Sequence, residues 1–205
     1  PARHELGFLF GALGEGERAI ELFRETVELE RNDAHLWFHL GVAHHQRRQL
    51  DAAIAAYRKT VELDPDTRWE YWNNLGAVLG DTGESDEALM AFQKACEIAP
   101  GHWRTHHNLA MTLLDRGEAA AAIAPLQKAL SFDPTRVPVL DGLGVALSKA
   151  GRIDEAIEVY RKALELEPAS ANLHCNLGVA FAKRGEADAA IVGYQKAIQL
   201  DPEFA

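Results

Sequence analysis

A period of 34 residues constrains the fold of this chain more than any other feature of its sequence. Six similar segments follow one another, and the same alanine recurs in them at intervals of 34 residues, with a single interval of 35. A small residue preceded by leucine stands twelve positions before each alanine, and proline stands twelve positions after it in five of the six copies. The alanines are Ala19, Ala53, Ala88, Ala122, Ala156 and Ala190. A fixed period of this length predicts one structural unit per copy, stacked on its neighbours.

Each copy has the pattern of two helices joined by a tight turn. In the third copy, apolar residues recur three or four positions apart before Gly83, which is the rhythm of one helix face. Gly83 ends this helix, because glycine adopts the left-handed conformation at little cost. A second periodic run from Ala88 to Cys96 follows Ser85 and Asp86, which can cap its start, and Pro100 ends it. We therefore predict an all-α superhelix, one solenoid over residues 1–205, with hairpins at approximately 1–33, 34–68, 69–102, 103–136, 137–170 and 171–204.

The small residue of the first helix is expected to let the two helices of a hairpin approach closely. In the third copy we expect Gly76 to face Ala88, where a larger side chain would overpack the contact. Substituting leucine at such a position, as in Gly144→Leu, is expected to destabilise the fold by about 1 to 3 kcal/mol.

The spacing of these residues resembles the tetratricopeptide repeat, and the resemblance covers essentially the whole chain. The matching residues of the third copy are Trp72, Leu75, Gly76, Leu79, Gly83, Ala88, Phe92, Ala95 and Pro100. The second copy departs from the pattern, with Arg48 in place of the turn glycine. The resemblance implies a right-handed superhelix whose first helices line a concave groove for an extended peptide.

Carried over by register, the same resemblance implies which residues face the groove. These peptide-binding candidates are His35, Phe38, His39, Glu70, Asn73, Asn74, Arg104, His107, Asn108, Met111, Asp115, Asp141 and Asn176. The set is mixed in charge, with apolar members beside carboxylates. The carboxylates favour a ligand with some positive character, the alternative being that they form a solvated face.

Three asparagines of the groove share one register. Asn74, Asn108 and Asn176 could bind a peptide backbone, because an amide group both donates and accepts hydrogen bonds. This resembles the asparagine ladder of the O-GlcNAc transferase repeat arm. The register is interrupted in the other copies by Glu5, His39 and Gly142. The alternative is that asparagine is simply common at this position in the family.

A second binding mode of the family, the carboxylate clamp of chaperone-binding arms, is disfavoured. Phe38 and Val42 stand where the clamp needs lysine and asparagine. The chain carries 21 Lys and Arg against 31 Asp and Glu, so its net charge of −10 repels phosphate backbones and anionic lipid headgroups. We therefore expect neither nucleic acid nor a membrane surface as a partner.

The histidines raise the question of a metal site. His35 with His39, and His102 with His106, are four residues apart, which places two imidazoles on one helix face. Neither pair has an obvious third ligand in the sequence, and His106 and His174 stand in the packing register of Trp72. We predict no metal site, no cofactor and no catalytic residues, since the phosphate-loop, nucleophile-elbow and dinucleotide motifs are absent.

These observations predict a scaffold that binds a protein or peptide segment and is not itself an enzyme. One alternative is the substrate-recruiting arm of a larger enzyme, such as a glycosyltransferase; another is self-association through uncapped ends. No capping helix is recognisable, which suggests a segment of a longer protein. The only two cysteines, Cys96 and Cys175, form no CxxC pair, and no apolar run approaches the roughly 20 residues of a membrane span. A cytoplasmic location is the weak expectation.

Overall fold

The protein is described by a computed structural model over residues 2–203, and this part of the chain folds into twelve α-helices without a strand. In chain order they are α1 (Ala2–Ala12), α2 (Gly16–Leu29), α3 (Ala34–Gln46), α4 (Leu50–Leu63), α5 (Trp69–Thr82), α6 (Ser85–Ile98), α7 (Trp103–Asp115), α8 (Ala119–Phe132), α9 (Val137–Lys149), α10 (Ile153–Leu166), α11 (Ala171–Arg184) and α12 (Ala187–Leu200). Each repeat contributes two helices, so the predicted all-α class of repeated hairpins is confirmed.

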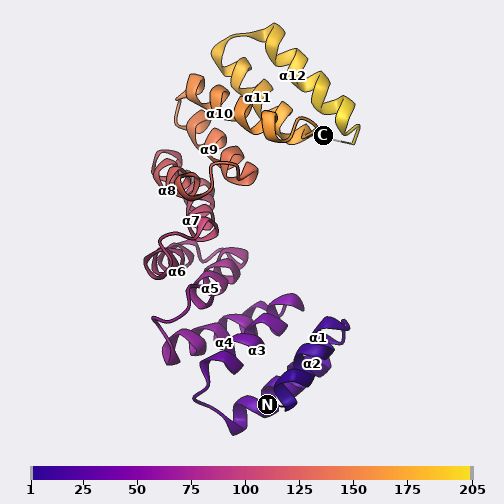
Figure 1. Ribbon diagram of the computed structural model, residues 1–205, viewed down its shortest axis with the longest axis vertical. Helices are drawn as coiled ribbons and strands as arrows, with labels where there is room; N and C mark the ends of the chain where they lie inside the picture. The colour runs from indigo at the N-terminus through magenta and orange to yellow at the C-terminus, as the bar shows by residue number, and fades with distance from the viewer. Residues whose placement is uncertain (1, 204–205) are drawn as a thin grey trace. The chain divides into compact units, whose positions relative to one another are not determined.

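The hairpins belong to two compact units, which divide between Pro100 and Gly101. The first unit holds α1 to α6 and the second holds α7 to α12. Within each unit the two helices of a hairpin pack on each other, and the second helix also packs on the first helix of the next hairpin (Figure 1). A hairpin therefore buries its apolar side against a neighbour, as expected of a repeat unit.

The turn inside five hairpins carries a glycine in the left-handed conformation. At Gly83 and Gly185, which end α5 and α11, φ is 85° and 89°. These values suit glycine because it has no Cβ to clash with the backbone. The remaining turn uses Arg48 with φ 57°, at the position where the sequence departs from glycine. The Arg48 guanidinium donates a 2.9 Å hydrogen bond to Asp81, so the side chain of this turn is held against α5.

The small residue of the first helix makes room for an aromatic ring. A Cβ added at Gly76 would lie 2.9 Å from Cε1 of Phe92, and one added at Gly144 would lie 2.4 Å from Cε1 of Tyr160. Both rings are buried. The atoms nearest to Gly76 are thus those of Phe92 rather than of Ala88, because the ring one turn further along α6 fills the space that glycine leaves.

An aromatic position near the start of the first helix fixes the loop between hairpins. The indole N–H of Trp72 donates a 2.6 Å hydrogen bond to the carbonyl oxygen of Pro65. In the last hairpin His174 takes this role, with Nε2 3.0 Å from the carbonyl oxygen of Pro168. His106 stands in the same register and is 9% exposed. The burial of His106 agrees with the packing role predicted from its register, whereas the half-buried His174 hydrogen-bonds Pro168.

Candidate functional site

The first helices of neighbouring hairpins contact one another, α3 with α5 in the first unit and α9 with both α7 and α11 in the second. We call the accessible side of these first helices the inner face of each unit, formed by α1, α3 and α5 or by α7, α9 and α11. The predicted binding residues all lie on α3, α5, α7, α9 or α11, and none lies on α1.

The inner face of the first unit is largely aromatic at the second hairpin. Phe38 is half-buried, and its ring centroid lies 5.0 Å from that of Tyr71 on α5 and 5.9 Å from that of Tyr57 on α4. Tyr71 and Tyr57 are buried. Phe38 therefore has a fixed position on the face, with one part of its ring accessible.

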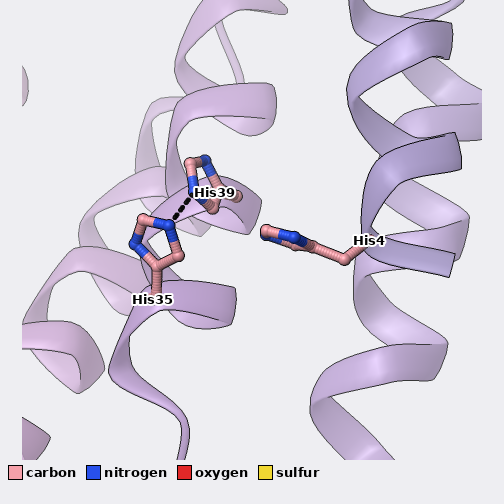
Figure 2. Close-up of side chains that lie close together, drawn as sticks. All are labelled: His4, His35 and His39. Atoms are coloured by element: carbon pink, nitrogen blue, oxygen red, sulfur yellow. Dashed lines mark hydrogen bonds between the residues drawn. The ribbon is translucent and has the colours of Figure 1, made fainter. Parts of the chain in front are cut away.

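Three histidines of the first unit meet between α1 and α3 (Figure 2). The Nε2 atoms of His35 and His39 lie 3.0 Å apart, and His4 points toward them from α1. Burial, followed by the neighbouring His35, lowers the pKa of His39 to about 3. Burial is also the main cause that lowers the pKa of His35, ahead of the charge of Arg68. The imidazoles of His35 and His39 are therefore neutral near pH 7.

A hollow of about 320 Å³ opens beside this cluster, between α1, α2 and α3. Its walls include Phe8, Val42, Ala43 and Gln46, and His39 forms part of them. Most of these groups are apolar, and the Gln46 amide can form hydrogen bonds with a ligand. The hollow could accommodate an apolar side chain of a bound segment.

The third hairpin contributes Glu70, Asn73 and Asn74 from α5. Glu70 and Asn74 are half-buried, whereas Asn73 is buried with 7% exposed. Among the described residues, no group hydrogen-bonds the Asn74 amide. Asn74 therefore offers a donor and an acceptor at the inner face, while Asn73 belongs to the interior of the hairpin.

The inner face of the second unit is built around Asp141 on α9. Its carboxylate accepts hydrogen bonds from the amides of Asn176, at 2.8 Å, and Asn172, at 2.9 Å, both on α11. Burial raises the pKa of the Asp141 carboxyl, and the two amides oppose that rise. One N–H of the Asn176 amide is thus used within the protein, which leaves its second N–H and its carbonyl oxygen for a ligand.

Besides Arg104, the neighbouring helix α7 carries four predicted residues. His107, Asn108 and Met111 are half-buried, and burial lowers the pKa of His107. A Cβ added at Gly142 would lie 3.6 Å from Sδ of Met111 and 3.9 Å from Nε2 of His107, so these three positions adjoin. Asp115, the fourth, is exposed at the end of the helix.

Arg104 is exposed near the start of α7. Its guanidinium carbon lies 5.5 Å from the ring centroid of Trp103, within the range of a cation–π contact. The cationic group is therefore held at the beginning of the helix, while Asp141 lies on the next hairpin.

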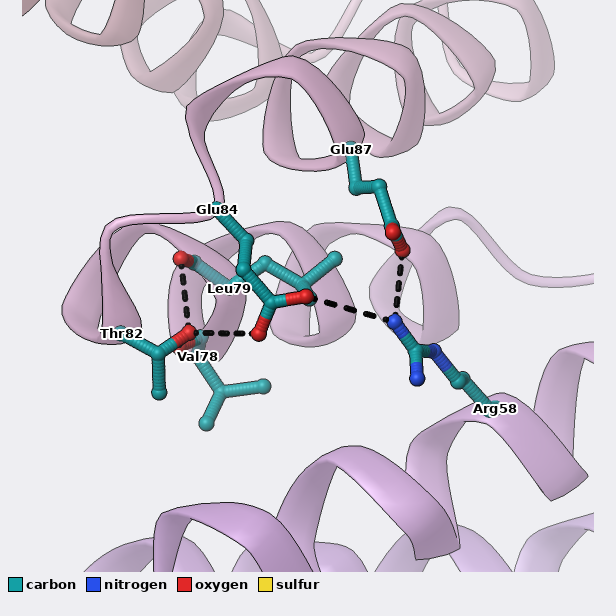
Figure 3. Close-up of polar contacts among 6 residues, drawn as sticks. All are labelled: Arg58, Val78, Leu79, Thr82, Glu84 and Glu87. Carbon is teal, nitrogen blue, oxygen red and sulfur yellow. Dashed lines mark hydrogen bonds and ion pairs between the residues drawn. The ribbon is translucent and has the colours of Figure 1, made fainter.

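Polar contacts also join the second and third hairpins of the first unit (Figure 3). The Arg58 guanidinium on α4 donates to Glu87 at 2.6 Å and to Glu84 at 3.5 Å. Glu84 also accepts a 3.0 Å hydrogen bond from the hydroxyl of Thr82. These groups are exposed, so their ion pairs contribute little to stability.

Sequence reasoning missed two residues of the first unit. His4 was absent from the predicted set, although alignment of the first two copies places it in the register of Phe38. Tyr71 was missed because it lies in a core register, yet its hydroxyl is 3.4 Å from Nδ1 of His35. Applying the register of Phe38 to the first copy would have indicated His4.

Comparison with known families gives a match over residues 8–203 to the family described as the cilia and flagella-associated protein 70 C-terminal domain. Among curated proteins, the peroxisomal targeting signal receptor of Candida albicans is 32% identical over 88 residues, which are 41% of this chain and 15% of the receptor. Superkiller protein 3 of Saccharomyces cerevisiae is 32% identical over 82 residues, 40% of this chain and 6% of that protein. The chain thus aligns with only a small part of either relative.

Solved structures resemble the chain over most of its length. One is described as YrrB, a TPR protein with an unusual peptide-binding site; it has a TM-score of 0.76 and 24% identity and covers 89% of this chain and 93% of its own. MamA from Desulfovibrio magneticus RS-1 has a TM-score of 0.77 and 19% identity, covering 83% of this chain and 96% of its own. At these identities the likeness concerns the fold. Within the described residues, no helix has the length and apolar character that a bilayer crossing requires.

Proposed function

We propose that this chain, which belongs to the tetratricopeptide repeat family represented by the C-terminal domain of cilia and flagella-associated protein 70, binds an extended protein segment along the inner faces of its hairpins. The chain is a protein-interaction scaffold. The proposal assigns it no reaction of its own.

The observation that carries the proposal is the available amide of Asn74 on α5, in the same unit as Phe38. Asn74 is half-buried, and none of the described groups hydrogen-bonds its amide, so this amide is available to a ligand. An extended segment exposes its own backbone N–H and C=O groups, which an asparagine can pair without reading the side chain. Phe38 and the hollow beside His39 would add apolar contact.

The inner face of the second unit also suits an extended segment, but it offers negative charge beside apolar contact. Met111 supplies a flexible apolar contact, and Asp141 and Asp115 supply negative charge. Because both amide contacts of Asp141 come from neutral groups, its carboxylate charge stays uncompensated by them. A segment with Lys or Arg beside apolar residues fits this face best. YrrB, which shares the fold, is likewise described as having a peptide-binding site.

Peptide selection followed by a binding assay tests the proposal. Peptides are selected from a random library displayed on phage, and their affinity for the chain is measured by fluorescence anisotropy. We expect Asn74→Ala to weaken a selected peptide by about 5- to 10-fold, the equivalent of one net hydrogen bond of about 1 kcal/mol. The matched control is Gln93→Ala, which removes an exposed amide from the second helix α6.

The expected result is weaker binding for Asn74→Ala, unchanged binding for Gln93→Ala, and the same helical content by circular dichroism in both. Equal affinities for the two variants would remove Asn74 from the site. Failure to select any peptide would count against the proposal as a whole. Repeating the measurement with Asn108→Ala tests the inner face of the second unit.

Self-association is a second candidate function, favoured by apolar residues on α12. Ile191, Val192 and Ile198 are 51%, 65% and 56% exposed. A second copy of the chain could cover them and remove their apolar surface from water. Light scattering at two concentrations should then show mass increasing with concentration, and Val192→Lys should suppress the increase. A monomer at both concentrations would dismiss this function.

A further inference from the structure

We propose that His4, His35 and His39 form a binding site for a divalent transition-metal ion of the zinc class. The sequence predicted no metal site because the pair His35 and His39 lacked a third ligand. The structure brings His4 to that pair from another hairpin (Figure 2). One ring nitrogen of each histidine then lies within 4.8 Å of the other two.

The separations suit a tetrahedral ion with three imidazole ligands. Zn–N distances of about 2.0 to 2.1 Å place two nitrogens of a tetrahedron roughly 3.3 Å apart. The Nε2 atoms of His35 and His39 are 3.0 Å apart, so a small rotation of either ring reaches this value. His4 needs a larger but still local adjustment, because its ligand atom lies no more than 4.8 Å from those of the pair.

One buried ring nitrogen of the cluster has no hydrogen-bond partner among the described residues, and a cation would bind it. Nε2 of His4 is buried, and no described residue hydrogen-bonds it. Between His35 and His39 the two Nε2 atoms share a single hydrogen bond, in which one must donate and the other accept. A metal ion lets the lone pair of each of these nitrogens bind the same cation.

Tyr71 supports one of the three ligands from behind. When Nε2 of His35 binds a metal, its proton resides on Nδ1, which lies 3.4 Å from the hydroxyl oxygen of Tyr71. Tyr71 is 2% exposed, so this oxygen is fixed in position. A hydrogen-bond partner on the second ring nitrogen is typical of histidine ligands and fixes the ring orientation.

The surroundings combine an apolar wall with one charge of each sign. Phe8 lies against two of the ligands, with its ring centroid 4.6 Å from His4 and 4.3 Å from His39. Asp33 favours a positive charge at His35 while Arg68 opposes it, and the Asp33 carboxylate accepts a 2.8 Å hydrogen bond from the backbone N–H of His35. Because the ligands are three imidazoles, the site prefers zinc, nickel or copper over magnesium or calcium.

Three protein ligands leave the fourth position of a tetrahedron open. Water or a side chain of a bound segment can occupy it. Because His4 belongs to α1 and the other two ligands to α3, a bound ion would also cross-link the first hairpin to the second. The ion is thereby expected to stabilise the first hairpin against local opening.

Calorimetric titration of the chelator-treated chain with zinc chloride at neutral pH tests the proposal. We expect one zinc ion per chain and a higher unfolding temperature in the presence of zinc. His4→Phe keeps an aromatic ring but removes the third ligand, and it should weaken binding more than about tenfold. The matched control His45→Phe makes the same substitution on α3 outside the cluster and should leave affinity unchanged.

Cobalt chloride gives an independent readout, because tetrahedral Co²⁺ absorbs visible light far more strongly than octahedral Co²⁺. Should His4→Phe fail to fold, Tyr71→Phe replaces it, with an expected loss of about tenfold in affinity. Absence of zinc binding to the unmodified chain would overturn the proposal. So would equal affinity in His4→Phe and the unmodified chain, since zinc would then be bound without the third histidine.

Discussion

Gly76→Ala is expected to destabilise the third hairpin, although alanine is the better helix former. The added Cβ would lie 2.9 Å from Cε1 and 3.0 Å from Cδ1 and Cζ of Phe92. Carbon atoms pack at about 3.5 to 4.0 Å, so the ring or the helix has to move by roughly 0.5 to 1 Å. Phe92 is buried, with 4% of its surface exposed, and such overpacking costs about 1 to 3 kcal/mol.

The gain in helix propensity works against this cost. Replacing glycine by alanine in a helix stabilises it by about 1 kcal/mol, so the free energy of unfolding should fall by roughly 0 to 2 kcal/mol in Gly76→Ala. Gly80→Ala is the matched control one turn later on α5, where an added Cβ meets no atom within 4 Å. This variant keeps the gain without the clash.

Urea unfolding followed by far-UV circular dichroism measures both variants. Their difference in unfolding free energy isolates the steric cost, and it should be about 1 to 3 kcal/mol with Gly80→Ala the more stable. Equal stability of the two variants would refute the idea that the small residue is there to admit the ring.

Two further predictions concern the turns and the histidines. Gly83 has φ 85°, so Gly83→Ala should lower the free energy of unfolding by about 1 to 2 kcal/mol, and the urea assay would contradict this if the midpoint did not move. Burial lowers the pKa of His35, and lowers that of His39 to about 3, so the unfolded chain binds more protons than the folded chain below pH 6.5. The stability that these two neutral histidines contribute should therefore be fully present above pH 6.5 and be lost as the pH falls toward 3. Solvent screening keeps the slope of this loss below about 1.4 kcal/mol per pH unit for each histidine. His39→Phe should flatten the profile, and an equally steep profile in that variant would contradict the assignment.

The fold could be predicted almost entirely from the sequence, because the repeat multiplies every local signal. The glycine in five of the six turns and the proline after five of the six second helices mark helix ends independently of tertiary structure. Arg48 shows how strong the pattern is, since it adopts φ 57° at a position where neighbouring copies have glycine. The role of Gly76 was harder to foresee, because which atoms fill a gap between two helices depends on side-chain directions as well as on register.

The binding residues could be predicted only in part. Register places Asn74, Asn108 and Asn176 on equivalent positions, but it does not tell which amides are already used. Asn176 donates to Asp141, while no described group hydrogen-bonds Asn74. That difference arises from the residues on the adjacent hairpin. The resemblance to the O-GlcNAc transferase arm, which depends on a repeated ladder, stays a prediction.

The histidine cluster was missed for a related reason. The pair His35 and His39 is visible in the sequence because four residues separate its members on one helix. His4 lies 31 residues before His35, in a different repeat, and approaches the pair only once the first hairpin packs on the second. A search for ligands along one helix cannot find such a contact, whereas a search between adjacent copies can.

The most direct test of the central claim is an NMR titration of the isotope-labelled chain with a selected peptide. A segment bound along the inner faces should shift backbone and side-chain amide signals of the first helices, with the Asn74 amide among the most affected. Signals of the second helices, including the Gln93 amide on α6, should change little. Shifts concentrated on the second helices would contradict the account.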